Sequence, residues 1–84
     1  MNKYVVSYDI SESPERNETY IKLLRELPKM GGVRKLLNVW ELESNLNTKD
    51  IFDKIKNIID SEDNSLMVAN LSENPKYYNL KKLD

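Results

Sequence analysis

Two helical patterns, each apolar on one side only, alternate with strand patterns along this chain of 84 residues. The first helix is expected to run from the Ser13 cap and Pro14 to about Leu27, and the second from Thr48 to about Asp60. Their apolar residues follow helical spacing: Tyr20, Ile21, Leu23, Leu24 and Leu27, then Ile51, Phe52, Ile55, Ile58 and Ile59. A helix with one apolar side has to bury it, so both helices are expected to pack on a sheet.

Three stretches have the β-branched and aromatic content of strands: residues 3–10, 34–43 and 65–71. The middle stretch is long enough to be one bent strand or a compressed pair, and periodicity leaves both open. Pro28 is expected to stop the first helix, and Gly31 and Gly32 to let the chain reverse. Two short helices cannot cover both faces of a small sheet. The predicted fold class is therefore α+β, a single ferredoxin-like α/β sandwich domain over residues 1–84 with an antiparallel sheet and both helices on one face.

The sheet face without helices is expected to be covered by a second copy of the chain, because both alternations along the strands are largely apolar. We therefore predict a homodimer. Residues 72–84 include Tyr77, Tyr78 and Leu80, so they are too apolar for a solvated tail and too short to fold alone. They are interpreted as a C-terminal extension that can add a strand to the partner subunit's sheet edge.

The chain contains no His and no Cys, which removes zinc fingers, cysteine nucleophiles and imidazole bases. The remaining chemistry is carboxylates with a hard metal such as Mg²⁺, hydroxyl groups, and Lys or Arg as charge stabilisers. The lack of cysteine and of a signal peptide predicts a cytoplasmic location. No apolar run reaches the roughly 18 to 20 residues that cross a bilayer, so no membrane partner is expected.

Asp9 and Trp40 each have a functional and a structural interpretation. Asp9 follows the first strand, where it could bind a metal ion together with its copy across a two-fold axis, or could bond the turn backbone at Ser11 or Glu12. Trp40 lies inside a strand, where its ring could stack on a nucleobase or pack in the core or a dimer interface.

Basic residues are concentrated in the middle of the chain although its formal net charge is −1. From Lys22 to Lys35 there are five basic residues against Glu26 alone, a local net charge of +4. Four cations are candidates for binding phosphates: Arg16, Arg25, Arg34 and Lys35. The alternative is a solvated face, since several of these residues also have the spacing of an exposed helix side.

Two segments, Tyr4 to Ile10 and Arg34 to Glu41, resemble the CRISPR-associated protein 2 family. Members of that family open with an aliphatic strand ending in Tyr-Asp-Ile, and their second strand carries an Arg, a spacer, a small polar residue, Val and an aromatic. The resemblance covers nearly the whole chain. It implies a ferredoxin-like homodimer that is a metal-dependent endonuclease on RNA or DNA, or a scaffold in the complex that captures spacers in antiviral defence.

The resemblance also implies site residues. Asp9 matches the metal-binding Asp of the family and Tyr8 its neighbour, so these two are the expected catalytic residues, with Mg²⁺ on Asp9. Arg34 matches the Arg of the second motif, Trp40 its aromatic, and Arg16 falls near the family's basic residues. With Lys35 these three form the expected nucleic-acid-binding set.

One loop departs from the family pattern. Residues 11–18 are mostly acidic and polar, where the family commonly has consecutive basic residues. This departure keeps two alternatives open beside the endonuclease. One is a non-catalytic dimeric scaffold that works with a protein partner in a larger complex, and the other is a toxin-type ribonuclease like the related virulence-associated protein D.

Overall fold

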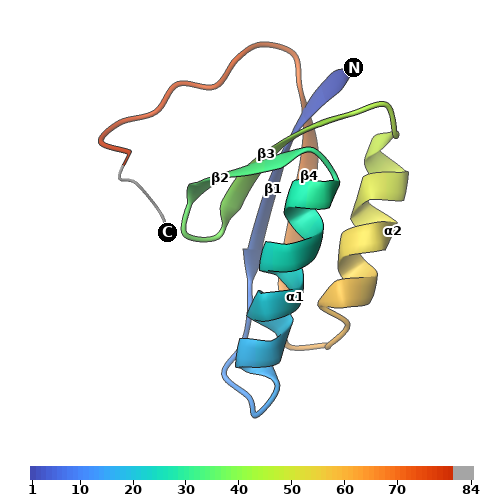
Figure 1. Ribbon diagram of the computed structural model, residues 1–84, viewed down its shortest axis with the longest axis vertical. Coiled ribbons are helices and arrows are strands. Elements are labelled where there is room, and N and C mark those ends of the chain that lie inside the picture. The colour runs from blue at the N-terminus through green and yellow to red at the C-terminus, as the bar shows by residue number, and fades with distance from the viewer. Residues whose placement is uncertain (81–84) are drawn as a thin grey trace.

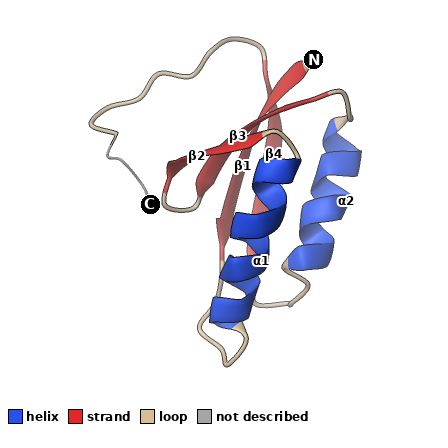
Figure 2. Cartoon of the chain, viewed as in Figure 1, coloured by secondary structure: helices blue, strands red, loops and turns tan. Residues whose placement is uncertain are grey.

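The computed structural model describes residues 1–80. Its elements are β1 (Asn2–Asp9), α1 (Arg16–Lys29), β2 (Gly32–Leu36), β3 (Val39–Ser44), α2 (Thr48–Ile58) and β4 (Ser65–Leu71). The strands form one sheet in the order β2-β3-β1-β4, and all neighbours are antiparallel. Both helices lie side by side on one face of this sheet (Figures 1 and 2). The expected ferredoxin-like α+β sandwich is therefore confirmed.

The core lies between the helices and the sheet because alternate strand residues face the helices. In β1 these are Tyr4, Val6 and Tyr8. Six further residues of the core come from β3 and the two helices: Trp40, Leu42, Leu23, Leu27, Ile51 and Ile55. The buried hydroxyl of Tyr4 donates a hydrogen bond of 2.5 Å to the backbone oxygen of Leu46. This buried polar group is therefore hydrogen-bonded, as such groups usually are.

Both expected ends of the first helix are wrong. α1 begins at Arg16, with Glu15 as N-cap and no side-chain capping bond, because Pro14 and Glu15 form a turn first. Ser13 takes part through its backbone oxygen, which accepts from the Arg16 amide at 3.2 Å. At the other end Pro28 lies inside the last helical turn instead of stopping the helix, and its backbone oxygen accepts from the Gly31 amide at 3.1 Å.

The segment 34–43, left open by its periodicity, belongs to two strands. β2 and β3 are joined by a tight turn at Leu37 and Asn38, and their register shifts between Arg34 and Leu36. Such a shift is a β-bulge, which adds a residue to one strand and changes the direction of the side chains beside it. The second helix begins as expected, since the Asn47 side chain caps α2 by accepting from the Asp50 amide at 2.8 Å.

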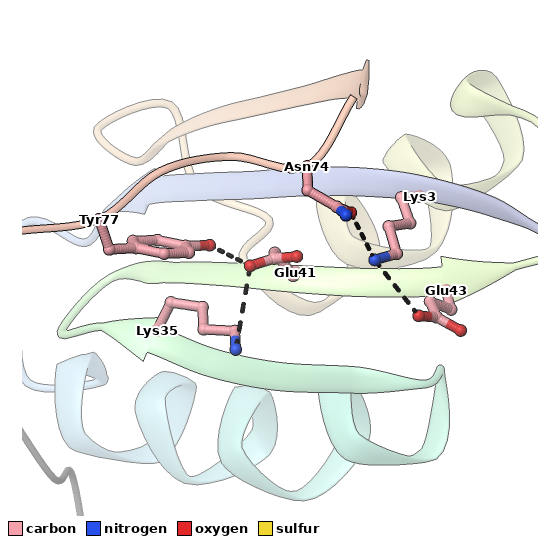
Figure 3. Close-up of polar contacts among 6 residues, drawn as sticks. All are labelled: Lys3, Lys35, Glu41, Glu43, Asn74 and Tyr77. Atoms are coloured by element: carbon pink, nitrogen blue, oxygen red, sulfur yellow. Dashed lines mark hydrogen bonds and ion pairs between the residues drawn. The ribbon is translucent and has the colours of Figure 1, made fainter. Parts of the chain in front are cut away.

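The segment after β4 leaves the sheet edge, loops outward (Figure 1) and reaches side chains on the face that carries no helix (Figure 3). Asn74 and Tyr77 reach side chains of β1 and β3 there. The final part of the expected extension, residues 81–84, lies outside the described residues. Pairing of the extension with a partner subunit stays a prediction.

Across residues 1–80 neither helix has the length and apolar composition needed to span a membrane.

Candidate functional site

Asp9 and Tyr8 are neighbours in sequence but point to opposite faces of the sheet, as successive strand residues do. Tyr8 faces the helices and is 3% exposed, whereas Asp9 is exposed at the end of β1. The expected catalytic pair is therefore separated by the sheet itself. The Tyr8 side chain belongs to the core and lies on the other side of the sheet from the Asp9 carboxylate.

Tyr8 and Trp40 form a buried polar pair. The indole Nε1 of Trp40 donates a hydrogen bond of 2.9 Å to the Tyr8 hydroxyl, which satisfies the one polar group of a large aromatic ring. Trp40 is 3% exposed, so its ring offers no face on which a base could stack. Of the two interpretations of Trp40, packing in the core is confirmed and base stacking is wrong.

The turn after β1 is held by Asn64 and not by Asp9. The Asn64 Oδ1 accepts from the Ser11 amide at 2.8 Å and lies 3.1 Å from the Ser11 hydroxyl. The structural interpretation of Asp9, bonding to the turn backbone, is thus not what the molecule uses. Within residues 1–80, the Asp9 carboxylate makes no hydrogen bond or ion pair, which leaves all its acceptor positions open.

The surroundings of Asp9 offer hard oxygen donors. Asp9 lies in a shallow hollow at the end of β1 and the beginning of β4, whose other lining residues are Ser7, Tyr8, Ser65, Leu66 and Met67. The part of the chain that the structure describes has no cluster of three acidic side chains suited to a metal ion. Mg²⁺ is commonly held by one or two carboxylates, with waters and substrate phosphates as its other ligands. The donor chemistry at Asp9 fits this ion, and a second Asp9 from a partner subunit would complete a carboxylate pair.

Arg16 and Arg34 gather around Tyr8 on the helix side of the same sheet end. The Arg16 guanidinium lies 5.5 Å from the centre of the Tyr20 ring, and that ring is 6.4 Å from the ring of Tyr8. The positive charge of Arg34 acts on the Tyr8 hydroxyl. The structure therefore brings Arg16 beside the aromatic pair of Tyr20 and Tyr8, and Tyr20 is a member that sequence reasoning missed.

The Arg16 side chain keeps one donor unused. Its Nε atom is buried and has no hydrogen-bond partner in the described chain, while its Nη1 atom lies 3.9 Å from the Glu12 carboxylate. An unsatisfied buried donor costs about 1–3 kcal/mol, which an oxygen of water or of a phosphate would recover.

Lys35 lies on the other face of the sheet from Arg34. Its Nζ atom is 3.9 Å from the Glu41 carboxylate and 5.8 Å from the centre of the Tyr77 ring (Figure 3). Arg34 stands opposite Trp40 in the strand register, on the helix side. Strand alternation thus places these two phosphate-binding candidates on opposite faces of the sheet, and phosphate binding by either stays a prediction. Glu41 ends the second family-like segment and Tyr77 belongs to the expected extension, but the contact between them was not predicted from the sequence.

The buried Tyr8 hydroxyl is expected to make the free energy of unfolding fall at alkaline pH. Burial, as the largest effect, raises the pKa of Tyr8 above its usual value, although the Trp40 bond and the charge of Arg34 act the other way. A pKa raised in the folded state gives a contribution that is complete below the unfolded value of about 10 and is lost as pH rises through the folded value. We expect Tyr8→Phe to weaken this loss, measured by urea unfolding from pH 9 to pH 12.

The matched control for that experiment is Tyr78→Phe, because Tyr78 is 88% exposed. Its unfolding should keep the alkaline pH dependence of the wild type. An equal pH dependence in Tyr8→Phe and the wild type would contradict the buried role of the Tyr8 hydroxyl.

The fold defines the class of this chain as a ferredoxin-like domain with an exposed carboxylate at one sheet end. No family model matches the chain, and no curated protein matches it. Among solved structures, it is similar to a hypothetical protein, TT1823 from Thermus thermophilus, with a TM-score of 0.71 and 21% sequence identity. That match covers 98% of this chain and 95% of the other. At this identity the likeness establishes the shared fold.

Proposed function

We propose that this protein is a homodimeric endonuclease domain of the CRISPR-associated protein 2 type, which acts on RNA or DNA with Mg²⁺ held by Asp9. The observation that carries the proposal is the Asp9 carboxylate. It is exposed at the end of β1 and has no hydrogen-bond or ion-pair partner among residues 1–80. A carboxylate with no structural task is available for an external cation.

The homodimer would supply the second carboxylate. Asp9 lies in the strand alternation that faces away from the helices, together with Val5 and Met67 of the open face. Pairing of two copies through that face would bury its apolar residues and bring the β1 ends toward a common axis. Such a pair of carboxylates, with water and a substrate phosphate, matches the ligand set that Mg²⁺ prefers.

The cations have a separate task. Arg16 and Arg34 lie on the helix side of the sheet, and their charge would attract the phosphate backbone toward this domain. A metal bound at Asp9 would supply a water of lowered pKa and stabilise charge on the phosphate. The chain itself has no imidazole, and Tyr8 is buried, so its own residues bind and position the substrate without acting as general base.

The deciding test is cleavage of labelled single-stranded RNA and double-stranded DNA by wild type and Asp9→Asn. We expect cleavage by the wild type with Mg²⁺ or Mn²⁺, none with chelator, and a loss of at least about a hundredfold in the variant, because one metal ligand is removed. Asp53→Asn is the matched control, since that carboxylate pairs with Lys49 on α2 and is far from the site in sequence. Equal cleavage by wild type and Asp9→Asn would contradict the proposal.

A non-catalytic scaffold is the second candidate. It is favoured by one observation, that the described residues place a single carboxylate at the site and no group suited to act as a base beside it. For a scaffold, the dimer and its nucleic-acid affinity would persist in Asp9→Asn, and neither protein would cleave. Light scattering on both proteins, against a chain mass of 9.9 kDa, reports the dimer in the same samples. A cytoplasmic location is proposed with either function, since the chain has no cysteine.

A further inference from the structure

Residues 72–80, here called the strap, pass over part of the sheet face that carries no helix, on which Val33 and Met67 stay exposed (Figure 3). Two side chains of the strap contact this face. The Oδ1 atom of Asn74 accepts a hydrogen bond of 2.8 Å from Lys3 on β1, and the Tyr77 hydroxyl donates one to the Glu41 carboxylate on β3. We propose that the strap is a removable cover, which occupies the open face of its own subunit and so opposes self-association through that face.

The contact at Tyr77 involves three elements of the chain. Glu41 accepts from the Tyr77 hydroxyl and pairs with Lys35 at 3.9 Å, while Lys35 also lies 5.8 Å from the centre of the Tyr77 ring. These three residues, here called the latch, come from the strap, β3 and β2. The side chains of Glu41 and Lys35 are 16% and 31% exposed, so their charges are partly shielded from water. Shielding strengthens such contacts relative to a fully exposed ion pair.

The latch sits among the apolar residues that a second subunit would need. In the strand register Glu41 stands beside Val5 on β1 and Val33 on β2, and Val5 stands beside Ala69 on β4. Tyr77 is therefore bonded to the polar member of a mostly apolar row. A second subunit that packs on this row has to break the hydrogen bond between the Tyr77 hydroxyl and Glu41. It then covers a Glu41 carboxylate that has lost this donor.

The strap is held on the sheet by few contacts, so it can detach from the open face. No backbone hydrogen bond within residues 1–80 joins it to the sheet, so the ladder of β4 does not continue into it. Most of its residues are exposed, including Tyr78 at 88% and Leu80 at 41%. Segments with few buried contacts open at low free energy. A cover with these properties can be removed without unfolding the domain.

A cross-link tests whether the strap covers its own subunit. The chain has no cysteine, so Lys3→Cys/Asn74→Cys gives one defined pair for a short bis-maleimide. We expect a product of single-chain mass at micromolar protein, and none with the control pair Lys54→Cys/Asn74→Cys, because Lys54 is exposed on α2 across the sheet. The closed product should then stay monomeric at concentrations where the unlinked protein associates. Products of twice the single-chain mass at every concentration would overturn the proposal.

The latch is tested by comparing Tyr77→Phe with Tyr78→Phe. Each variant loses one hydroxyl, and only the hydroxyl of Tyr77 donates to Glu41. This part rests on the proposed homodimer. We expect Tyr77→Phe to tighten self-association about three- to tenfold in sedimentation, the size expected for one partly exposed hydrogen bond to a charged group. Tyr78→Phe should match the wild type. Equal association of the two variants would overturn the latch.

One outcome separates this inference from the proposed function. If the single-chain cross-link forms but no variant associates even at the highest concentration, the proposed homodimer is contradicted. The part of the proposal in which the strap opposes self-association is then contradicted as well. The strap as a cover within its own subunit would then stand. If the proteins associate and the cross-link joins two chains, the homodimer stands and the strap proposal fails.

Discussion

Trp40→Ala is expected to lower the free energy of unfolding by about 3–5 kcal/mol, the range for removing a buried large aromatic side chain. Trp40 is 3% exposed and belongs to the core between helices and sheet. The substitution also leaves the buried Tyr8 hydroxyl without its indole donor. Because small domains have only about 5–15 kcal/mol of stability in total, the variant should be largely unfolded at 37 °C. Thermal and urea unfolding followed by circular dichroism measures the loss.

Trp40→Phe separates packing from hydrogen bonding at the same position. Phenylalanine keeps much of the ring volume and lacks the Nε1 donor, so we expect a smaller loss of about 1–3 kcal/mol. A stable, folded Trp40→Ala protein with weakened nucleic-acid binding would contradict the core assignment. That result would restore the base-stacking interpretation.

Gly31→Ala is the second substitution with a large expected effect, about 2–4 kcal/mol. Gly31 has φ of +82°, a backbone conformation that residues with a Cβ rarely adopt. A methyl group there would also overlap the backbone oxygen of Glu43. That part of β3 already bonds to Gly31, since the Glu43 amide donates to the Gly31 oxygen at 3.2 Å. Urea unfolding followed by fluorescence of Trp40, the single tryptophan, measures the change.

Gly31→Asn distinguishes the two causes. Asparagine tolerates positive φ better than alanine but keeps the Cβ that overlaps Glu43. We therefore expect Gly31→Asn to stay destabilised by more than half of the Gly31→Ala loss. Recovery of wild-type stability in Gly31→Asn would show that backbone conformation alone sets the requirement for glycine.

The fold could be predicted because its signals are local. The one-sided helices and the alternation of residues 3–10 depend on spacing within single elements, and both are present in the structure. The helix ends could not be placed, because Pro14 and Pro28 were interpreted from general preferences. In the molecule the first lies in a turn and the second lies inside the last helical turn, where its backbone oxygen accepts from the Gly31 amide.

The candidate site could be predicted only in part, because strand alternation and tertiary contacts decide which residues meet. Asp9 is exposed as a metal site requires, yet Tyr8 and Trp40 turn toward the helices and are buried. Arg34 and Lys35 are consecutive, and strand alternation leaves them on opposite faces. The meeting of Arg16 with Tyr20 and Tyr8 joins α1 to β1, which no motif in the sequence encodes.

The central place of β1 also has a consequence for how the chain is made. β1 is synthesised first, yet both strands that flank it come later, and β4 comes last, with Lys3 beside Leu71 and Asp9 beside Ser65. Contacts between such distant segments close late in folding and slow it. While the chain emerges from the ribosome, the edge of β1 that pairs with β4 therefore stays unpaired until β4 has been synthesised. A growing chain with this topology depends on prompt completion of its own C-terminal third to escape aggregation.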